Sequence, residues 1–178
     1  MNADERRAPA SLHIAAVAVL TALTFVIGLI RVPLPATQGI FTLADVAIFC
    51  AAFALGPFSA ALAGGIGAAL IDLIGGTAQY APTSLVVHGL EGLVAGLIAL
   101  AAAGKLSTVV FWVLASIAGT AVMAGGYLAA ETLFYGGFAT AATEIVFNVA
   151  QGAAGAIGGA LIAVAVRRGY PPLTRLRW

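Results

Sequence analysis

The sequence contains little charge and a single cysteine. Only 8% of its 178 residues are Asp, Glu, Lys or Arg, and Cys50 stands alone. One cysteine excludes an internal disulfide, a CxxC redox pair and a thiolate metal cluster. The serine-hydrolase pattern GxSxG, the zinc-protease pattern HExxH and the Walker A loop are also absent from the sequence. We therefore expect a protein that is not an enzyme and does not hydrolyse ATP by the Walker route.

Long hydrophobic runs take up most of the chain. Hydrophobic residues make up 62% of the sequence, and its mean hydropathy is +1.08. Each run is close to the ~20 residues that a helix needs to cross about 30 Å of hydrocarbon. We predict an all-α membrane protein, a single integral membrane domain over 1–178, with the first run kept as a span and not cleaved as a signal peptide. The predicted transmembrane helices are 12–30, 41–56, 58–75, 83–103, 107–130 and 142–166.

The basic residues predict the orientation of these six spans. With the N-terminus inside, only Arg31 among the basic residues lies outside, and the bias of Lys and Arg toward the cytoplasm supports this topology. Both termini are then cytoplasmic, in the cell membrane of a bacterium or archaeon. The outer connections (31–40, 76–82 and 131–141) are longer than the inner turns, which indicates that the outer face is the working face. The inner basic residues are Arg6, Arg7, Lys105, Arg167, Arg168, Arg175 and Arg177.

Small residues recur at four-residue spacing in several spans. Such stripes let helix backbones approach closely in lipid. We expect most of them to pack inside the bundle, and we single out Ala18 and Ala22 of the first span as a face for a partner. The internal stripes are Ala60, Gly64 and Ala68; Gly92 and Gly96; Ala115 and Gly119; and Gly155 and Gly159.

The polar residues within the spans gather in their outer halves. A carboxylate at mid-bilayer costs at least ~2.5 kcal/mol, so it usually faces a cavity or a partner. His88 and Glu91 are i, i+3 neighbours, and spacings of four and three residues place three polar side chains of the sixth span on one face. These positions predict a polar pocket that opens outward and is closed below by Ala/Gly packing. The sixth-span residues are Glu144, Asn148 and Gln151.

Each of these groups also has a structural interpretation. Asp45, like Thr42 before it, can cap a helix, and Asp72 can bind loop backbone; for both carboxylates we favour a structural role. His88 and Glu91 can neutralise each other as a buried pair, and the sixth-span amides can bridge helices. We favour ligand contact for these. No metal site is expected, because His88 and Glu91 are only two converging ligands.

Several segments resemble a known family of membrane proteins. They are Ala18-Val-Leu-Thr-Ala22, Arg31-Val-Pro-Leu-Pro35, the stretch from Leu43-Ala-Asp-Val-Ala-Ile-Phe49 to Ala63-Gly-Gly-Ile-Gly67, and Tyr80-Ala-Pro82 with His88-Gly-Leu-Glu-Gly-Leu93. Over residues 12–100 the chain resembles the substrate-binding S component of an energy-coupling factor (ECF) vitamin transporter. Beyond residue 100 only the number and length of the spans match.

The resemblance implies a six-helix S-component fold that captures a vitamin or vitamin precursor near the outer surface. It also implies that Ala18 and Ala22 dock on a transmembrane T component driven by two ATPase subunits, and that the S component topples in the membrane to deliver its cargo. In the family, the outer parts of spans four to six and the outer loops hold the ligand. The candidate ligand contacts here are Glu91, His88, Asn148, Gln151, Glu144, Tyr127, Tyr80 and Arg31.

The excess of acids over Arg31 in the outer half predicts an uncharged or cationic heterocycle as ligand. Glu91, as the deepest carboxylate, is expected to carry most of the polar recognition, and the two amides to read the ring edges. The resemblance suggests a hydroxymethylpyrimidine- or pyridoxine-type ligand. We expect loop 31–40 to act as a lid. No cofactor, metal or nucleic acid is expected.

Two alternative functions remain open at this point. The first is a stand-alone, proton-coupled secondary carrier that uses Glu91 and His88 as a proton relay. The second is an intramembrane enzyme.

Overall fold

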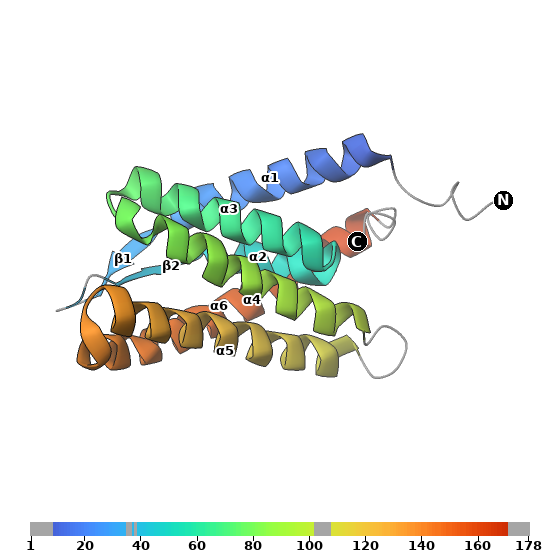
Figure 1. Ribbon diagram of the computed structural model, residues 1–178. Helices are drawn as coiled ribbons and strands as arrows, with labels where there is room; N and C mark the ends of the chain where they lie inside the picture. Colours follow the sequence, from blue (N-terminus) through green and yellow to red (C-terminus); the bar gives the residue numbers. More distant parts are fainter. Residues whose placement is uncertain (1–8, 35–36, 38, 102–107, 171–178) are drawn as a thin grey trace.

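The described residues form six α-helices and a short β-hairpin (Figure 1). The computed structural model describes residues 9–34, 37, 39–101 and 108–170. Five of the helices described there are long and apolar enough to cross a membrane. The elements are α1 (Ala10–Gly28), β1 (Arg31–Pro33), β2 (Ile40–Thr42), α2 (Ala44–Ala54), α3 (Pro57–Gly75), the 3-10 turn η2 (Ala78–Tyr80), α4 (Ala81–Ala101), α5 (Thr108–Phe134) and α6 (Gly137–Gly169).

The helices run alternately up and down the bundle. The start of α1, the α2–α3 turn and the end of α6 lie at one end, and the hairpin, the α3–α4 connection and the α5–α6 turn lie at the other (Figure 1). Arg167 and Arg168 occupy the last turn of α6, at the end that the distribution of basic residues assigns to the cytoplasm. Arg6, Arg7, Lys105, Arg175 and Arg177 lie outside the described residues.

Helix α2 is the shortest of the six and lies among the others. Its 11 residues extend about 16 Å, which is less than the hydrocarbon thickness of a bilayer. All of its residues except Val46 are buried, against α6, α3, α4 and α1. The predicted span 41–56 is thus a β-strand followed by a helix. The strand forms because Arg31–Pro33 pairs antiparallel with Ile40–Thr42, so the two ends of the expected lid loop 31–40 are paired as strands.

Glycines set the closest approaches between helices. A Cβ at Gly96 of α4 would lie 2.4 Å from the Pro57 Cα of α3, and one at Gly155 of α6 would lie 2.3 Å from the Asp45 Cβ of α2. Side chains at these points would force the helices apart, as expected for small-residue packing in membranes. All the residues of the predicted internal stripes are buried, so that prediction is confirmed.

The outer ends of α5 and α6 extend further than the sequence predicted. The expected outer loop 131–141 is helical except at Tyr135 and Gly136, because α5 continues to Phe134 and α6 begins at Gly137. Gly137 has a positive φ of 77°, which permits the abrupt turn. The extra turns of helix place Glu131 and Glu144 on opposite sides of the turn, with both side chains lining the pocket described next.

Candidate functional site

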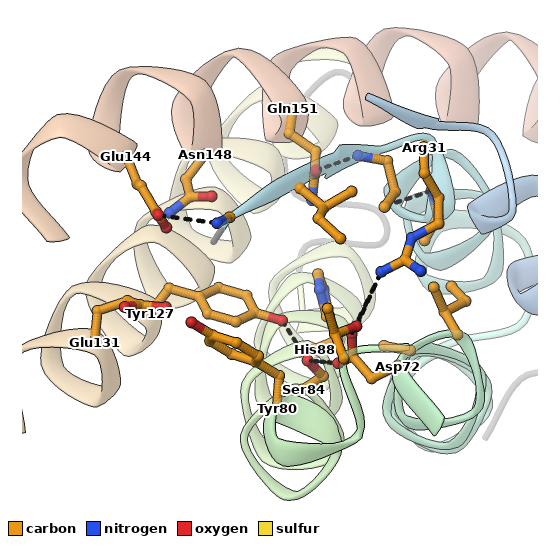
Figure 2. A pocket seen from close by; sticks show the side chains of 17 residues that line it. Arg31, Asp72, Tyr80, Ser84, His88, Tyr127, Glu131, Glu144, Asn148 and Gln151 are labelled. Atoms are coloured by element: carbon orange, nitrogen blue, oxygen red, sulfur yellow. Dashed lines mark hydrogen bonds and ion pairs between the residues drawn. The ribbon is translucent and has the colours of Figure 1, made fainter. Parts of the chain in front are cut away.

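A pocket lies at the end of the bundle that carries the hairpin (Figure 2). Its cavity volume is about 70 Å³, and the empty space between its walls with the open mouth included is about 600 Å³. The hairpin, α3, α4, α5 and α6 all contribute to its walls. The lining residues are Arg31, Gly39, Ile40, Thr42, Ala44, Ala68, Ile71, Asp72, Thr77, Tyr80, Ser84, His88, Tyr127, Glu131, Glu144, Asn148 and Gln151.

Helix α6 supplies one polar wall of the pocket. Glu144, Asn148 and Gln151 all line the cavity, as their helical spacing predicted. Two of them also hold the hairpin: the Gly39 N–H donates to Glu144 Oε1 at 3.1 Å, and the Thr42 N–H donates to Gln151 Oε1 at 2.7 Å. Among the described residues Asn148 has no hydrogen-bond partner for its side chain, so its amide is available to a ligand.

Asp72 of α3 is the centre of a hydrogen-bond network on the opposite wall. The Thr77 hydroxyl donates to its Oδ1 at 2.7 Å and the Ser84 hydroxyl to its Oδ2 at 2.5 Å. Arg31 Nη2 donates to Thr77 Oγ1 at 2.9 Å and lies 4.0 Å from Asp72 Oδ1, while Nη1 donates to the Gly75 carbonyl. Arg31 therefore ties the hairpin to the end of α3. Its two Nη atoms donate to protein groups, and its Nε has no partner in the part of the chain that the structure describes.

Aromatic residues form the wall next to α5. The Tyr127 hydroxyl lies 2.7 Å from Ser84 Oγ, and since Ser84 donates to Asp72, Tyr127 donates to Ser84. The Tyr127 ring lies edge-on to His88, with centroids 5.6 Å apart. Near the mouth, the rings of Tyr80 and Tyr135 stack at 4.2 Å. A flat ring entering the pocket would meet these aromatic side chains.

His88 connects the pocket to two buried carboxyl groups behind it. Its Nδ1 lies 2.8 Å from Glu91 Oε2 and 3.5 Å from Asp45 Oδ1. Gln151 Nε2 donates to the same Asp45 oxygen at 3.4 Å. His88 lines the pocket, whereas Asp45 and Glu91 are fully buried and do not. With Nδ1 turned toward the carboxylates, Nε2 is the ring nitrogen that a ligand can reach.

Seven of the eight predicted ligand contacts line one cavity. The exception is Glu91, which lies one layer behind the pocket, so the expectation that it makes the main direct contact does not fit its position. The i, i+3 spacing places its side chain beside His88 but does not say which of the two faces the cavity. The seven are Arg31, Tyr80, His88, Tyr127, Glu144, Asn148 and Gln151.

Two further contributors were not singled out from the sequence. Thr77 and Ser84 line the pocket through the Asp72 network, and hydroxyl residues are too common in membrane helices to stand out by spacing. The structural interpretation had Asp72 bind loop backbone, whereas its two carboxylate oxygens accept hydrogen bonds from the Thr77 and Ser84 hydroxyls. Asp45 does not cap α2, since Thr42 Oγ1 accepts the Ala44 N–H at 3.4 Å while the Asp45 carboxylate is directed toward His88 and Gln151.

The fold and the pocket together define a helical protein with apolar helices long enough to cross a membrane and a polar pocket at one end of the bundle. Comparison with known proteins gives the family. The model of the family described as "ECF-type riboflavin transporter, S component" matches residues 10–168. The chain therefore belongs to the S components of ECF transporters and is a multi-pass membrane transport protein for uptake of a vitamin or vitamin precursor, not an enzyme.

Individual relatives agree with this family. The thiamine precursor transporter HmpT of Lactococcus lactis subsp. cremoris (strain MG1363) is 39% identical over 136 residues, which is 75% of each chain. An uncharacterized protein of Pyrococcus woesei is 30% identical over 154 residues, covering 85% of this chain and 99% of the relative. The solved structure of the S component of a bacterial ECF transporter shares the fold, with a TM-score of 0.69, 21% identity, and coverage of 90% of this chain and 98% of that chain.

Proposed function

We propose that this chain is the substrate-binding subunit of an ECF-type importer and that its ligand is a thiamine precursor of the aminopyrimidine type. The main support is the pocket itself, in which the polar face of α6 stands opposite a histidine backed by two buried carboxyl groups. The name of the relative HmpT points to the same class of ligand.

The charges around the pocket favour an uncharged or cationic ligand. Asp72 and Arg31 largely offset each other, which leaves Glu131 and Glu144 as the remaining charges on the lining. An anionic ligand such as a phosphate ester would meet these carboxylates without a free arginine or lysine among the described lining residues. An aminopyrimidine offers amino N–H donors to carboxylates and ring nitrogens as acceptors for N–H groups.

The proposed contacts follow from the donors and acceptors on each wall. His88 Nε2, the Asn148 amide and the Glu144 carboxylate recognise the polar edge of the ring, with Gln151 fixed beside them. Tyr80 and Tyr127 cover the ring and Arg31 holds the hairpin over it. Glu91 acts through His88, by orienting the imidazole.

A partner-docking face on α1 is the second part of the proposal. Ala18 and Ala22 lie four residues apart on α1, and both side chains are exposed on the surface of the bundle. Two methyl side chains leave a shallow strip on which a helix of a T component can pack closely. Ala18→Trp or Ala22→Trp is expected to abolish transport and co-purification with a T component while ligand binding is retained. Ala121→Trp, an exposed alanine on α5, is the matched control and should keep both.

Uptake experiments distinguish this function from a stand-alone carrier. Cells lacking the endogenous transporter receive this chain alone, or this chain with a T component and two ATPases, and uptake of radiolabelled hydroxymethylpyrimidine is followed. Uptake that requires both the T component and ATP hydrolysis supports the proposal. Equal uptake by the chain alone, abolished by a proton uncoupler, would establish the proton-coupled carrier instead.

A further inference from the structure

Three ionisable side chains from two helices converge behind the pocket. Asp45 comes from α2, and His88 and Glu91 come from α4. One ligand atom of each lies within 4.8 Å of the others, and all three residues are buried. The sequence pointed to only two converging ligands, because Asp45 precedes His88 by 43 positions and is brought to it by the packing of α2 against α4.

Two of the four carboxylate oxygens in this cluster have no hydrogen-bond donor among the described residues. Both side chains are completely inaccessible to solvent, and Asp45 Oδ2 and Glu91 Oε1 have no hydrogen-bond partner among the described residues. A buried polar atom without a partner is costly, and an unpaired buried charge is more costly still. Two carboxylates with a neutral imidazole carry a charge of −2, which either two protons or one divalent cation would cancel.

We propose that Asp45, His88 and Glu91 bind one divalent transition-metal ion of the Zn²⁺ type. The distances from His88 Nδ1 to the two carboxylate oxygens are 2.8 and 3.5 Å. Two ligands on a metal with bonds of about 2.1 Å are separated by about 3.0–3.4 Å, so small shifts suffice to seat the ion. Mixed imidazole and carboxylate ligands suit Zn²⁺ and Mn²⁺ better than Mg²⁺, which keeps its water.

The two oxygens without partners fit this assignment. If each carboxylate binds the ion through both oxygens, Asp45 Oδ2 and Glu91 Oε1 become ligands and the site offers five donor atoms. The Gln151 amide donates to Asp45 Oδ1 and so holds this carboxylate in place. Side chains that hydrogen-bond to the ligands of a metal ion have the same role in known metal centres.

Metal binding would also fix the chemistry that His88 presents to the pocket. With Nδ1 bound to the ion, the proton of a neutral imidazole must reside on Nε2, so His88 offers an N–H donor to the ligand. This consequence depends on the proposed function. The ion site itself does not, and it is tested without any transported molecule.

Metal content of the purified protein is the direct test. The full chain is purified in detergent, freed of its affinity tag, stripped with EDTA and incubated with ZnCl₂, MnCl₂ or MgCl₂. After gel filtration, the protein is expected to hold about one Zn²⁺ per chain and to gain thermal stability with Zn²⁺ but not with Mg²⁺. X-ray absorption at the zinc edge should show one imidazole nitrogen with oxygens as the remaining ligands.

Conservative variants locate the ion. Asp45→Asn combined with Glu91→Gln should reduce bound zinc to about 0.1 per chain or less, whereas Glu144→Gln, a carboxylate of the pocket lining, should leave it near one. Absence of zinc from the unaltered protein, equal zinc in the double variant, or a zinc shell with sulfur or several imidazoles would each overturn the proposal. Should the double variant fail to fold, the zinc content and absorption spectrum of the unaltered protein still decide it.

Discussion

Two aspartates in the outer half of the bundle, Asp72 and Asp45, have opposite surroundings. Both oxygens of Asp72 accept hydrogen bonds from hydroxyl groups, and Arg31 lies nearby. Asp45 has one oxygen shared between Gln151 and His88 and another with no partner. A carboxylate whose hydrogen bonds are complete stabilises the structure, while one left incomplete in the interior is retained at a cost in stability. On this difference we expect a structural role for Asp72, and for Asp45 the role in ion binding proposed above.

The largest expected effect is loss of stability on changing Asp72. Asp72→Asn removes the negative charge near Arg31. It also replaces one carboxylate oxygen with an NH₂ group, which cannot accept the hydrogen bond that the Thr77 or Ser84 hydroxyl donates there. Because charge-assisted hydrogen bonds contribute about 1.5–3 kcal/mol each, the free energy of unfolding should fall by about 2–3 kcal/mol. Thermal unfolding in detergent measures this. An unchanged Tm would mean that the network contributes little to stability.

The next effect is on ligand binding through His88. His88→Gln keeps a polar side chain but removes the imidazole from the lining, and a ligand group left without its hydrogen-bond partner there corresponds to about 10- to 100-fold in affinity. Titration calorimetry with hydroxymethylpyrimidine measures it. His13→Gln, at the cytoplasmic end of α1, is the matched control and should bind as the parent does.

A smaller effect is expected at Glu91. Glu91→Gln should weaken binding by about threefold to tenfold, because Glu91 lies behind His88 and acts through it. The ranking of the two variants is the informative result. If Glu91→Gln loses more affinity than His88→Gln, Glu91 reaches the ligand directly, as the sequence alone suggested.

The smallest effect is expected for Asp45→Asn in metal-free protein. This substitution has the same chemistry as Asp72→Asn but removes a charge whose hydrogen bonds are incomplete. With EDTA present, the free energy of unfolding should stay the same or rise by about 1 kcal/mol. If Asp45→Asn lowers the free energy of unfolding as much as Asp72→Asn does, the two aspartates contribute equally to stability.

The sequence predicted the parts of this structure that depend on local periodicity. Hydrophobic runs located the helices, and the three-and-four spacing of Glu144, Asn148 and Gln151 placed them on one wall. The spacing of Gly92 and Gly96 likewise indicated close packing of α4, which their buried positions confirm.

The features that depend on contacts between distant segments could not be predicted in this way. The hairpin requires Arg31–Pro33 to meet Ile40–Thr42, and the convergence of Asp45 on His88 requires α2 to be buried beside α4. The position of Glu91 behind His88 depends on the rotation of α4 about its axis. A low hydrophobic contrast between the faces of a membrane helix leaves that rotation undetermined in the sequence.

Equilibrium binding to the purified protein tests whether the outer pocket selects a small, non-anionic aminopyrimidine. Thermal shift and calorimetry would compare hydroxymethylpyrimidine with its phosphate ester, thiamine and riboflavin under the same conditions. Hydroxymethylpyrimidine is expected to raise the Tm and to bind at least about tenfold more tightly than its phosphate ester. Tighter binding of the phosphate ester or of riboflavin would contradict it.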